Sequence, residues 1–455
     1  MAQITTINPA TEKPIRKYRV FTDADINITV KKAKSAFESW KKTSLDYRIR
    51  LVKNCSKVLR KRKKELSKLI TIEMGKPISQ SVAEIEKCAW LCDYTAKHAK
   101  SFLRDELIKT EAKKSFVAFE PLGVVAAVMP WNFTFWQVLR SAIPALTAGN
   151  TFVLKHSSTC IGSSLAIAKT MRDAGFPKAV FQTIIGGPQE GEFLVTHPDV
   201  NAITVTGSVE TGRRIYQLAS QGLKKCVLEL GGSDAFIILD DANLKLTCKE
   251  AVEGRLVASG QSCIAAKRFI VTRKRAKEFT QLFVELMEEK KVGNPLDMEM
   301  EVGPMAKLNQ LEKLDSQVKK SVAMGAKLLC GGRRLPWIGY YYAPTVLANV
   351  TKNMPVVREE TFGPVAPIII VRDEKAAIKA ANDTSFGLGT SIWTSDLKKG
   401  EKLARQIESG LVFVNEHVRS DPRMPFGGVK NSGIGRELDR YGMLEFTNIK
   451  SIKIS

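Results

Sequence analysis

The chain has 455 residues, 44% of them hydrophobic and 26% charged, so it can bury large cores, and general disorder is excluded. Seventy Lys and Arg against 47 Asp and Glu give a net charge of +23, a field that attracts phosphates and carboxylates as well as polyanions. The basic residues are scattered, apart from a run at 60–64 inside a helical pattern. The composition therefore predicts a solvated basic surface and no nucleic-acid partner.

Targeting, membrane and metal signals are weak. No window approaches the ~18 uninterrupted apolar residues of a membrane helix. The first residues also lack the basic and apolar regions of a secretory signal. Eight cysteines include no CxxC pair, and four histidines offer no HxxxH or HExxH pair. We therefore expect a cytoplasmic protein with no membrane partner, no disulfide framework and no metal site.

The first half of the chain changes character near residue 115. Helical periodicity predicts helices at 27–41, 46–73 and 79–103. Apolar strands then alternate with helical segments. The predicted strands are 124–129, 151–155, 179–185, 202–206 and 226–230, and the predicted helices are 136–146, 160–174, 190–196 and 209–221. This alternation predicts a doubly wound parallel sheet covered on both faces, which binds ligands at the carboxyl ends of its strands.

A second alternating block follows Gly231-Gly232. Its predicted strands are 236–239, 268–271, 365–371, 390–393 and 410–415, and its predicted helices are 247–259, 275–291, 308–324, 374–383 and 398–408. The last residues, 445–454, predict a strand with no evident neighbour in the chain. Such a strand often pairs with another subunit.

Two motifs follow strands of the first block. Asn132, within Pro130-Trp-Asn-Phe133, could donate its amide N–H to a developing oxyanion, or it could bond its own backbone in a turn. The segment 206–212 ends a strand and opens a helix, where amides favour a phosphate. It matches neither a P-loop nor GxGxxG, and its glycines are equally consistent with a structural turn.

Two further residues have the chemistry of a nucleophile and a base. Glu229 ends an apolar strand, where burial would raise its pKa toward that of a general base, although a satisfied core glutamate is an alternative. Cys263 lies in the turn 260–263, where helix amides and Arg or Lys would favour its thiolate. An inert buried cysteine is the alternative. Together these motifs form a consistent set on one α/β framework.

The ordered motifs resemble the aldehyde dehydrogenase superfamily over essentially the whole chain, and most of all its shorter bacterial and archaeal succinate-semialdehyde dehydrogenases. They lie at 130–133, 155–158, 206–212, 228–232, 260–263, 359–364, 415 and 425–433. The resemblance implies a fold of two doubly wound α/β domains with a small β oligomerisation extension. The cofactor domain would span 1–102 and 121–230, the catalytic domain 231–429, and the bridging segments 103–120 and 430–455. A homodimer or homotetramer is expected.

The resemblance also implies site residues. Cys263 would attack the aldehyde carbon, the Asn132 side chain and the Cys263 backbone N–H would hold the oxyanion, and Glu229 would activate the water that releases the acid. The residues implied to bind NADP or NAD are Trp131, Lys155, Ser158, Gly187, Gly207, Ser208, Glu360 and Phe362.

Two departures from the family pattern bear on specificity. Ser158 stands where NAD-preferring relatives often have a Glu, which removes a charge that would repel a 2′-phosphate, so we expect NADP to be accepted at least comparably with NAD. Arg140 matches the arginine that binds the substrate carboxylate in succinate-semialdehyde dehydrogenases. The family's second arginine is Val257 here, and Arg255 is either its substitute or a residue of the helix surface.

The resemblance thus implies NAD(P)-dependent oxidation of an aldehyde, most of all succinate semialdehyde, through a thiohemiacetal and a thioester on Cys263. Other small aldehydes, such as glyceraldehyde or glutarate semialdehyde, are alternatives. A CoA-acylating enzyme would commonly lack the deacylating Glu229. A non-catalytic or nucleic-acid-binding protein on the same fold would not require Cys263, Glu229 and Asn132 together.

Overall fold

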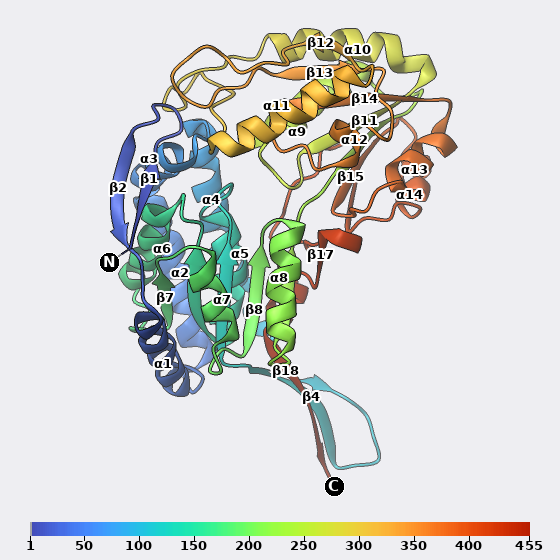
Figure 1. The fold of residues 1–455 in the computed structure, drawn as a ribbon. Helices are drawn as coiled ribbons and strands as arrows, with labels where there is room; N and C mark the ends of the chain where they lie inside the picture. The colour runs from blue at the N-terminus through green and yellow to red at the C-terminus, as the bar shows by residue number, and fades with distance from the viewer. Residues whose placement is uncertain (1) are drawn as a thin grey trace.

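The computed structural model describes residues 2–455 as two layered α/β bodies and a thin β arm (Figure 1). The chain begins with an antiparallel hairpin that the sequence analysis did not predict. Its strands are β1 (Gln3–Ile7) and β2 (Pro14–Arg19), and the helices α1 (Asp23–Trp40), α2 (Leu45–Lys61), α3 (Lys63–Met74) and α4 (Ile78–Phe102) follow. The single helix predicted at 46–73 is two helices, because the backbone leaves helical geometry at Arg62 (φ −96°, ψ 8°).

The first sheet has six strands in the order β17-β9-β8-β5-β6-β7. Its members are β5 (Val124–Met129), β6 (Thr151–His156), β7 (Phe181–Ile184), β8 (Ala202–Thr206), β9 (Lys225–Glu229) and β17 (Gly433–Ile434), and all pairs are parallel except β17 with β9. The helices between them are α5 (Trp136–Thr147), α6 (Ile161–Asp173), α7 (Pro188–Thr196) and α8 (Val209–Ser220). Helices α2 to α6 pack on one face, and α1, α7 and α8 on the other, which confirms the predicted doubly wound unit.

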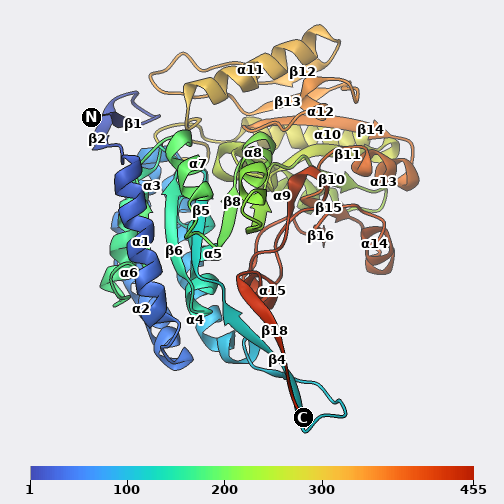
Figure 2. The same ribbon diagram turned by 60° about the horizontal axis from the view of Figure 1, so that its bottom comes forward.

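The second sheet has seven strands in the order β12-β13-β14-β11-β10-β15-β16, parallel except for the edge strand β12. The strands are β10 (Asp234–Ile238), β11 (Ala266–Thr272), β12 (Lys327–Cys330), β13 (Thr345–Ala348), β14 (Val365–Val371), β15 (Gly389–Trp393) and β16 (Leu411–Val414). The helices are α9 (Leu244–Leu256), α10 (Arg273–Glu288), α11 (Leu308–Ala323), α12 (Pro355–Arg358), α13 (Glu374–Asn382) and α14 (Leu397–Ala404). This sheet lies above the first in Figure 2.

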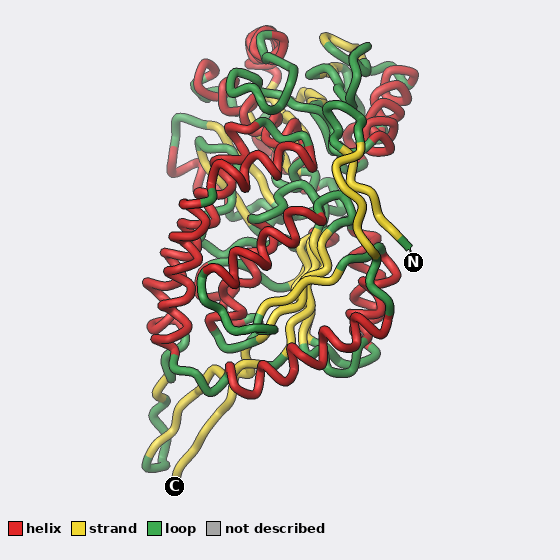
Figure 3. The backbone as a smooth tube through the Cα atoms, turned by 90° about the vertical axis from the view of Figure 1, so that its left-hand side faces the viewer, coloured by secondary structure: helices red, strands yellow, loops and turns green. Residues whose placement is uncertain are grey.

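A three-stranded antiparallel arm projects away from both bodies (Figures 1 and 3). Its strands are β3 (Glu106–Leu107), β4 (Lys114–Pro121) and β18 (Thr447–Ile454), in the order β18-β4-β3, and the short helix α15 (Asp439–Leu444) precedes β18. The expectation that the terminal strand has no neighbour in its own chain is wrong. β18 pairs along its whole length with β4, and only its outer edge is free among the described residues.

No helix within residues 2–455 combines the length and the apolar character that crossing a membrane requires.

Candidate active site

Two cavities meet at Cys263. The first, of about 200 Å³, is lined by Cys263 and by six other residues from the predicted site: Trp131, Asn132, Gly207, Ser208, Glu360 and Phe362. The second, of about 540 Å³, is lined by Cys263, Arg140 and a mixture of aromatic and basic side chains. Gln137 also lines both cavities. The thiol therefore stands where a ligand of one cavity meets a ligand of the other.

A strained turn carries Cys263. The segment Val257–Gly260 holds Ala258, Ser259 and Gly260 at φ values of 51°, 58° and 77°. Side chains rarely adopt this left-handed region, and a Cβ on Gly260 would overlap the Gly363 carbonyl, so only glycine fits there. Cys263 follows this turn immediately before β11, with its side chain partly exposed.

A buried lysine fixes the backbone of the nucleophile. Lys267 Nζ donates to the carbonyl oxygens of Ser262 (2.9 Å) and Cys263 (2.6 Å). It also lies 3.6 Å from Glu360 Oε1, so one ammonium joins the catalytic turn to a residue of the first cavity.

The protein around the Cys263 thiol favours its protonated form. Burial raises its pKa to about 12, although Arg140 and Lys267 act in the opposite direction. The expectation that the surroundings favour the thiolate is therefore wrong for this structure, because desolvation outweighs the nearby positive charges.

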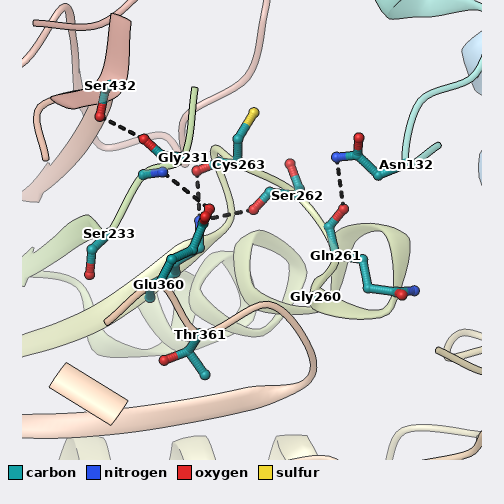
Figure 4. A network of polar contacts seen from close by, with 12 residues as sticks. Asn132, Gly231, Ser233, Gly260, Gln261, Ser262, Cys263, Glu360, Thr361 and Ser432 are labelled. Atoms are coloured by element: carbon teal, nitrogen blue, oxygen red, sulfur yellow. Dashed lines mark hydrogen bonds and ion pairs between the residues drawn. The ribbon is translucent and has the colours of Figure 1, made fainter. Parts of the chain in front are cut away.

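Asn132 is oriented by two hydrogen bonds. Gln137 Nε2 donates to Asn132 Oδ1 at 3.0 Å. Asn132 Nδ2 donates to the Gln261 carbonyl at 3.0 Å (Figure 4). The first bond determines which end of the carboxamide carries the N–H groups. One N–H of Nδ2 is left for a ligand in the cavity, which is the geometry that an oxyanion donor needs.

Glu229 lines neither cavity. It is 2% exposed, and its carboxylate oxygens accept no hydrogen bond from the described part of the chain. A Cβ on Gly427 would lie 2.7 Å from its Oε1, which places the carboxyl beside that loop. Burial, reinforced by Glu437, raises its pKa well above the usual range, in the direction expected from the sequence. The structure thus brings Cys263 and Asn132 together at the cavity but holds Glu229 outside it.

Two of the loops that line the first cavity meet at a pair of aromatic rings. The rings of Trp131 and Phe362 meet edge to face with centroids 5.7 Å apart. Glu360 accepts a hydrogen bond from Gly232 N at 3.1 Å, and a Cβ on Gly231 would overlap its carboxylate. This close approach explains the glycine pair that follows β9.

Gly207 and Ser208, the residues expected to face the phosphates of the cofactor, lie between the end of β8 and the start of α8. Ser208 caps α8 and accepts a hydrogen bond from Thr211 N, while a Cβ on Gly207 would meet only ordinary contacts. The backbone at Gly207 is thus not crowded by the protein itself. Amides at a helix start suit an anionic group.

Lys155, Ser158 and Gly187 do not line the first cavity. Lys155 is 8% exposed, and its Nζ makes no hydrogen bond or ion pair within residues 2–455; burial lowers its pKa to about 8. Gly187 begins α7, and its N–H is taken by Glu190 at 2.6 Å. An unpaired buried ammonium beside a half-buried serine fits the hydroxyl or phosphate oxygens of a dinucleotide.

Arg140 lines the second cavity but is already paired. Its Nε forms an ion pair with Glu437, and both side chains are 2% exposed. Nη2 donates to Thr206 Oγ1 at 3.3 Å, and the guanidinium lies 4.6 Å from the centroid of the Phe426 ring. Glu437 neutralises much of the charge that was expected to meet a substrate carboxylate.

Arg255 does not lie in either cavity, and both readings of it are wrong. It is 0% exposed, so it is not on the helix surface. Its guanidinium donates to the carbonyl oxygens of Ala266 (2.8 Å) and Gly260 (2.7 Å), and burial lowers its pKa to about 9. Arg255 therefore stabilises the turn that precedes Cys263, because buried backbone carbonyls there need hydrogen-bond donors.

Several supporting residues escaped the sequence analysis. Gln137 lies five residues after Asn132, and Lys267 four after Cys263, so their closeness to the motifs was an available signal. Glu437 comes from a distant segment and gives no local signal. The chain also contains a group of possible metal ligands from segments that are far apart in sequence, which short motifs do not reveal. In space, ligand atoms of Glu250, Glu253 and His417 lie within 4.8 Å of one another, with His417 already paired to Glu250 at 2.6 Å.

Comparisons with known proteins show which family the chain is similar to. The model of the aldehyde dehydrogenase family matches residues 1–452. A protein of Synechocystis sp., named a probable succinate-semialdehyde dehydrogenase (NADP+), is 44% identical and covers 99% of this chain and 100% of its own length. A succinate semialdehyde dehydrogenase (NAD(P)+) of Escherichia coli K12 is also 44% identical, with coverage of 98% and 97%.

A similar solved structure is that of succinic semialdehyde dehydrogenase from Streptococcus pyogenes in complex with NADP+. Its TM-score is 0.97 at 33% sequence identity, and 99% of each chain is covered.

Proposed function

The chain belongs to the aldehyde dehydrogenase family, and from this premise we propose that it oxidises succinate semialdehyde to succinate with NADP+ or NAD+. One observation carries the proposal: Cys263 stands at the junction of a cavity suited to a dinucleotide and a second, larger cavity with basic lining. The names of the relatives favour this aldehyde over glyceraldehyde or glutarate semialdehyde.

The chain's own residues divide the acylation step among them. After the Cys263 proton has passed to water, Sγ bonds to the aldehyde carbon while the electron pair of the carbonyl π bond moves to oxygen, which gives a thiohemiacetal. Asn132 Nδ2 and the Cys263 backbone N–H donate to the oxygen that becomes negative. The hydrogen bond from Gln137 orients the Asn132 N–H groups toward that oxygen. The hydrogen bond from Lys267 to the Cys263 carbonyl fixes the backbone of the nucleophile. An oxidised nicotinamide bound between Trp131, Glu360 and Phe362 would supply the hydride acceptor.

Deacylation requires a base. We assign this to Glu229, which takes a proton from the water that attacks the Cys263 thioester, releasing the acid and restoring the thiol. Since its carboxyl lies outside both cavities, the side chain has to turn from beside Gly427 toward Cys263 for this step.

We propose that NADP is used at least as well as NAD. Lys155 supplies a buried ammonium without a partner in the described chain, and Ser158 adds a hydroxyl and no negative charge. Gly187, Gly207 and Ser208 complete this part of the site. The relatives named for NADP+ or NAD(P)+ support the same choice.

The domain division and the assembly are proposals as well. The chain passes from the first sheet at β9 to the second sheet at β10, which supports a boundary near residue 231, and it returns to the first sheet only at β17. The free edge of β18 and the projecting arm support a homodimer or homotetramer.

The test is reduction of NADP+ followed by absorbance, with succinate semialdehyde as substrate. The wild-type protein should form reduced cofactor and free succinate without CoA, and Cys263→Ser should form neither. A requirement for CoA would instead indicate an acylating enzyme. Absence of turnover with either dinucleotide, or equal rates for wild type and Cys263→Ser, would refute the proposal.

A further inference from the structure

Four cationic side chains line the second cavity: Lys87, Arg140, Lys290 and Arg419. Three of them already have a carboxylate partner. Arg140 pairs with Glu437, Lys290 pairs with Glu301 at 2.6 Å, and Arg419 pairs with Glu416 at 2.8 Å. Lys87 alone among the four has no ion pair within residues 2–455.

Lys87 lies on the inner side of α4 and is held in the cavity by neutral groups. Its Nζ donates to Ser420 Oγ at 2.8 Å and stands 4.5 Å from the centroid of the Trp136 ring. Burial lowers its pKa to about 8, with Arg140 acting in the same direction, while Cys88 and the carboxylate of Asp421 act in the opposite direction. Lys87 is half-buried, and no carboxylate within residues 2–455 forms an ion pair with it. An anionic ligand in the cavity would therefore offset the cost of its partial burial.

The carboxylates that line the same cavity do not fill this role. Glu84 pairs with Lys76 and also accepts hydrogen bonds from Phe135 N and Trp136 N. Glu301 pairs with Lys290, and Glu253 belongs to the cluster with Glu250 and His417. Aromatic walls from Phe133 and Trp136 suit the methylene carbons of a short aliphatic substrate.

We propose that Lys87, with Ser420, binds the carboxylate of the substrate and so selects an anionic aldehyde. In this proposal the main contact of Arg140 is its ion pair with Glu437. Lys87, on α4, supplies the positive charge that the family's second arginine would supply at position 257. This inference rests on the proposed function, since it concerns the same cavity and the same reaction.

The test compares Lys87→Met and Lys87→Arg with the matched control Lys97→Met, an exposed lysine of the same helix. Two substrates are used, succinate semialdehyde and the uncharged butanal. A charged hydrogen-bonded pair is worth a factor of about ten or more in binding. Lys87→Met should raise KM for succinate semialdehyde by about that factor, leave kcat and the KM for butanal nearly unchanged, and be largely rescued by Lys87→Arg. Lys97→Met should match the wild type.

A second measurement separates this inference from the proposed function. Succinate is tested as an inhibitor of butanal oxidation, and its inhibition constant should rise about tenfold in Lys87→Met. If the wild type oxidises butanal but not succinate semialdehyde, the proposed function fails, while the inhibition constant still decides the role of Lys87. Equal losses with both aldehydes, or an unchanged inhibition constant for succinate, would overturn the assignment of Lys87.

Discussion

At the scale of single residues, burial controls both groups that must exchange protons. It raises the pKa of Cys263 to about 12 and that of Glu229 well above its usual range. In both groups burial favours the protonated form. For a general base the useful form is the unprotonated one, so a raised pKa moves its activity to higher pH.

The raised pKa of Glu229 leads to the first prediction. If Glu229 is the base, the rate of deacylation should increase as pH rises above the usual range of a carboxyl group, since a larger fraction of its carboxyl is ionised. Glu229→Gln should keep the first-turnover burst of reduced cofactor but lose about a hundredfold or more in steady-state rate. Rapid-mixing absorbance resolves the two phases. A deacylation rate that does not change with pH, or full steady-state turnover in Glu229→Gln, would contradict the role.

The second prediction concerns the orientation of Asn132. Gln137→Met removes the donor that fixes its carboxamide, so the amide can turn its oxygen toward the substrate. We expect kcat to fall about tenfold with little change in KM, compared with a hundredfold or more for Asn132→Ala. Since both act on one interaction, the double variant should be no slower than Asn132→Ala. Additive losses would show that Gln137 acts independently of Asn132.

At the scale of elements, the strands that the sequence predicts best are the most apolar. β5 and β8 are bounded as expected, because near-continuous apolar runs have few alternatives to a buried parallel sheet. The edge strand β12 was missed, since it is four residues long and partly exposed, and its neighbour β13 is equally short. Contacts such as Arg140 with Glu437 depend on segments far apart in the chain, and no local pattern encodes them.

The third prediction tests the turn before the nucleophile. Gly260→Ala adds a Cβ that overlaps the Gly363 carbonyl at a φ of 77°, so we expect a loss of about 1–3 kcal/mol in the free energy of unfolding and a large loss of activity as Cys263 moves. Gly325→Ala is the matched control, with a φ of 102° and no atom within 4 Å of the new Cβ. It should cost about 1 kcal/mol and keep wild-type kcat. Urea denaturation and steady-state kinetics measure both, and equal activities would exclude the turn from catalysis.

At the scale of the whole molecule, the arm is the part with the least support from its own chain. It exposes Leu107 (75%), Ile449 (61%) and Ile454 (48%), and β18 has a free edge among the described residues. A net charge of +23 makes copies repel one another at long range, so a stable assembly needs apolar contact of this kind. The assembly is therefore expected to depend on the arm.

The last prediction follows from these exposed side chains. Because Ile449 is already exposed, Ile449→Lys should leave the fold of a single chain intact, but it would bury a charge if a partner covers the arm. Light scattering should give two or four times 50.4 kDa for the wild type and a shift toward 50.4 kDa for Ile449→Lys. Leu397→Lys, at a residue exposed to 66% on α14, is the matched control and should leave the mass unchanged. A wild-type mass of 50.4 kDa, or an equal shift in both variants, would remove the arm from the assembly, since the effect would then not depend on where the charge is placed.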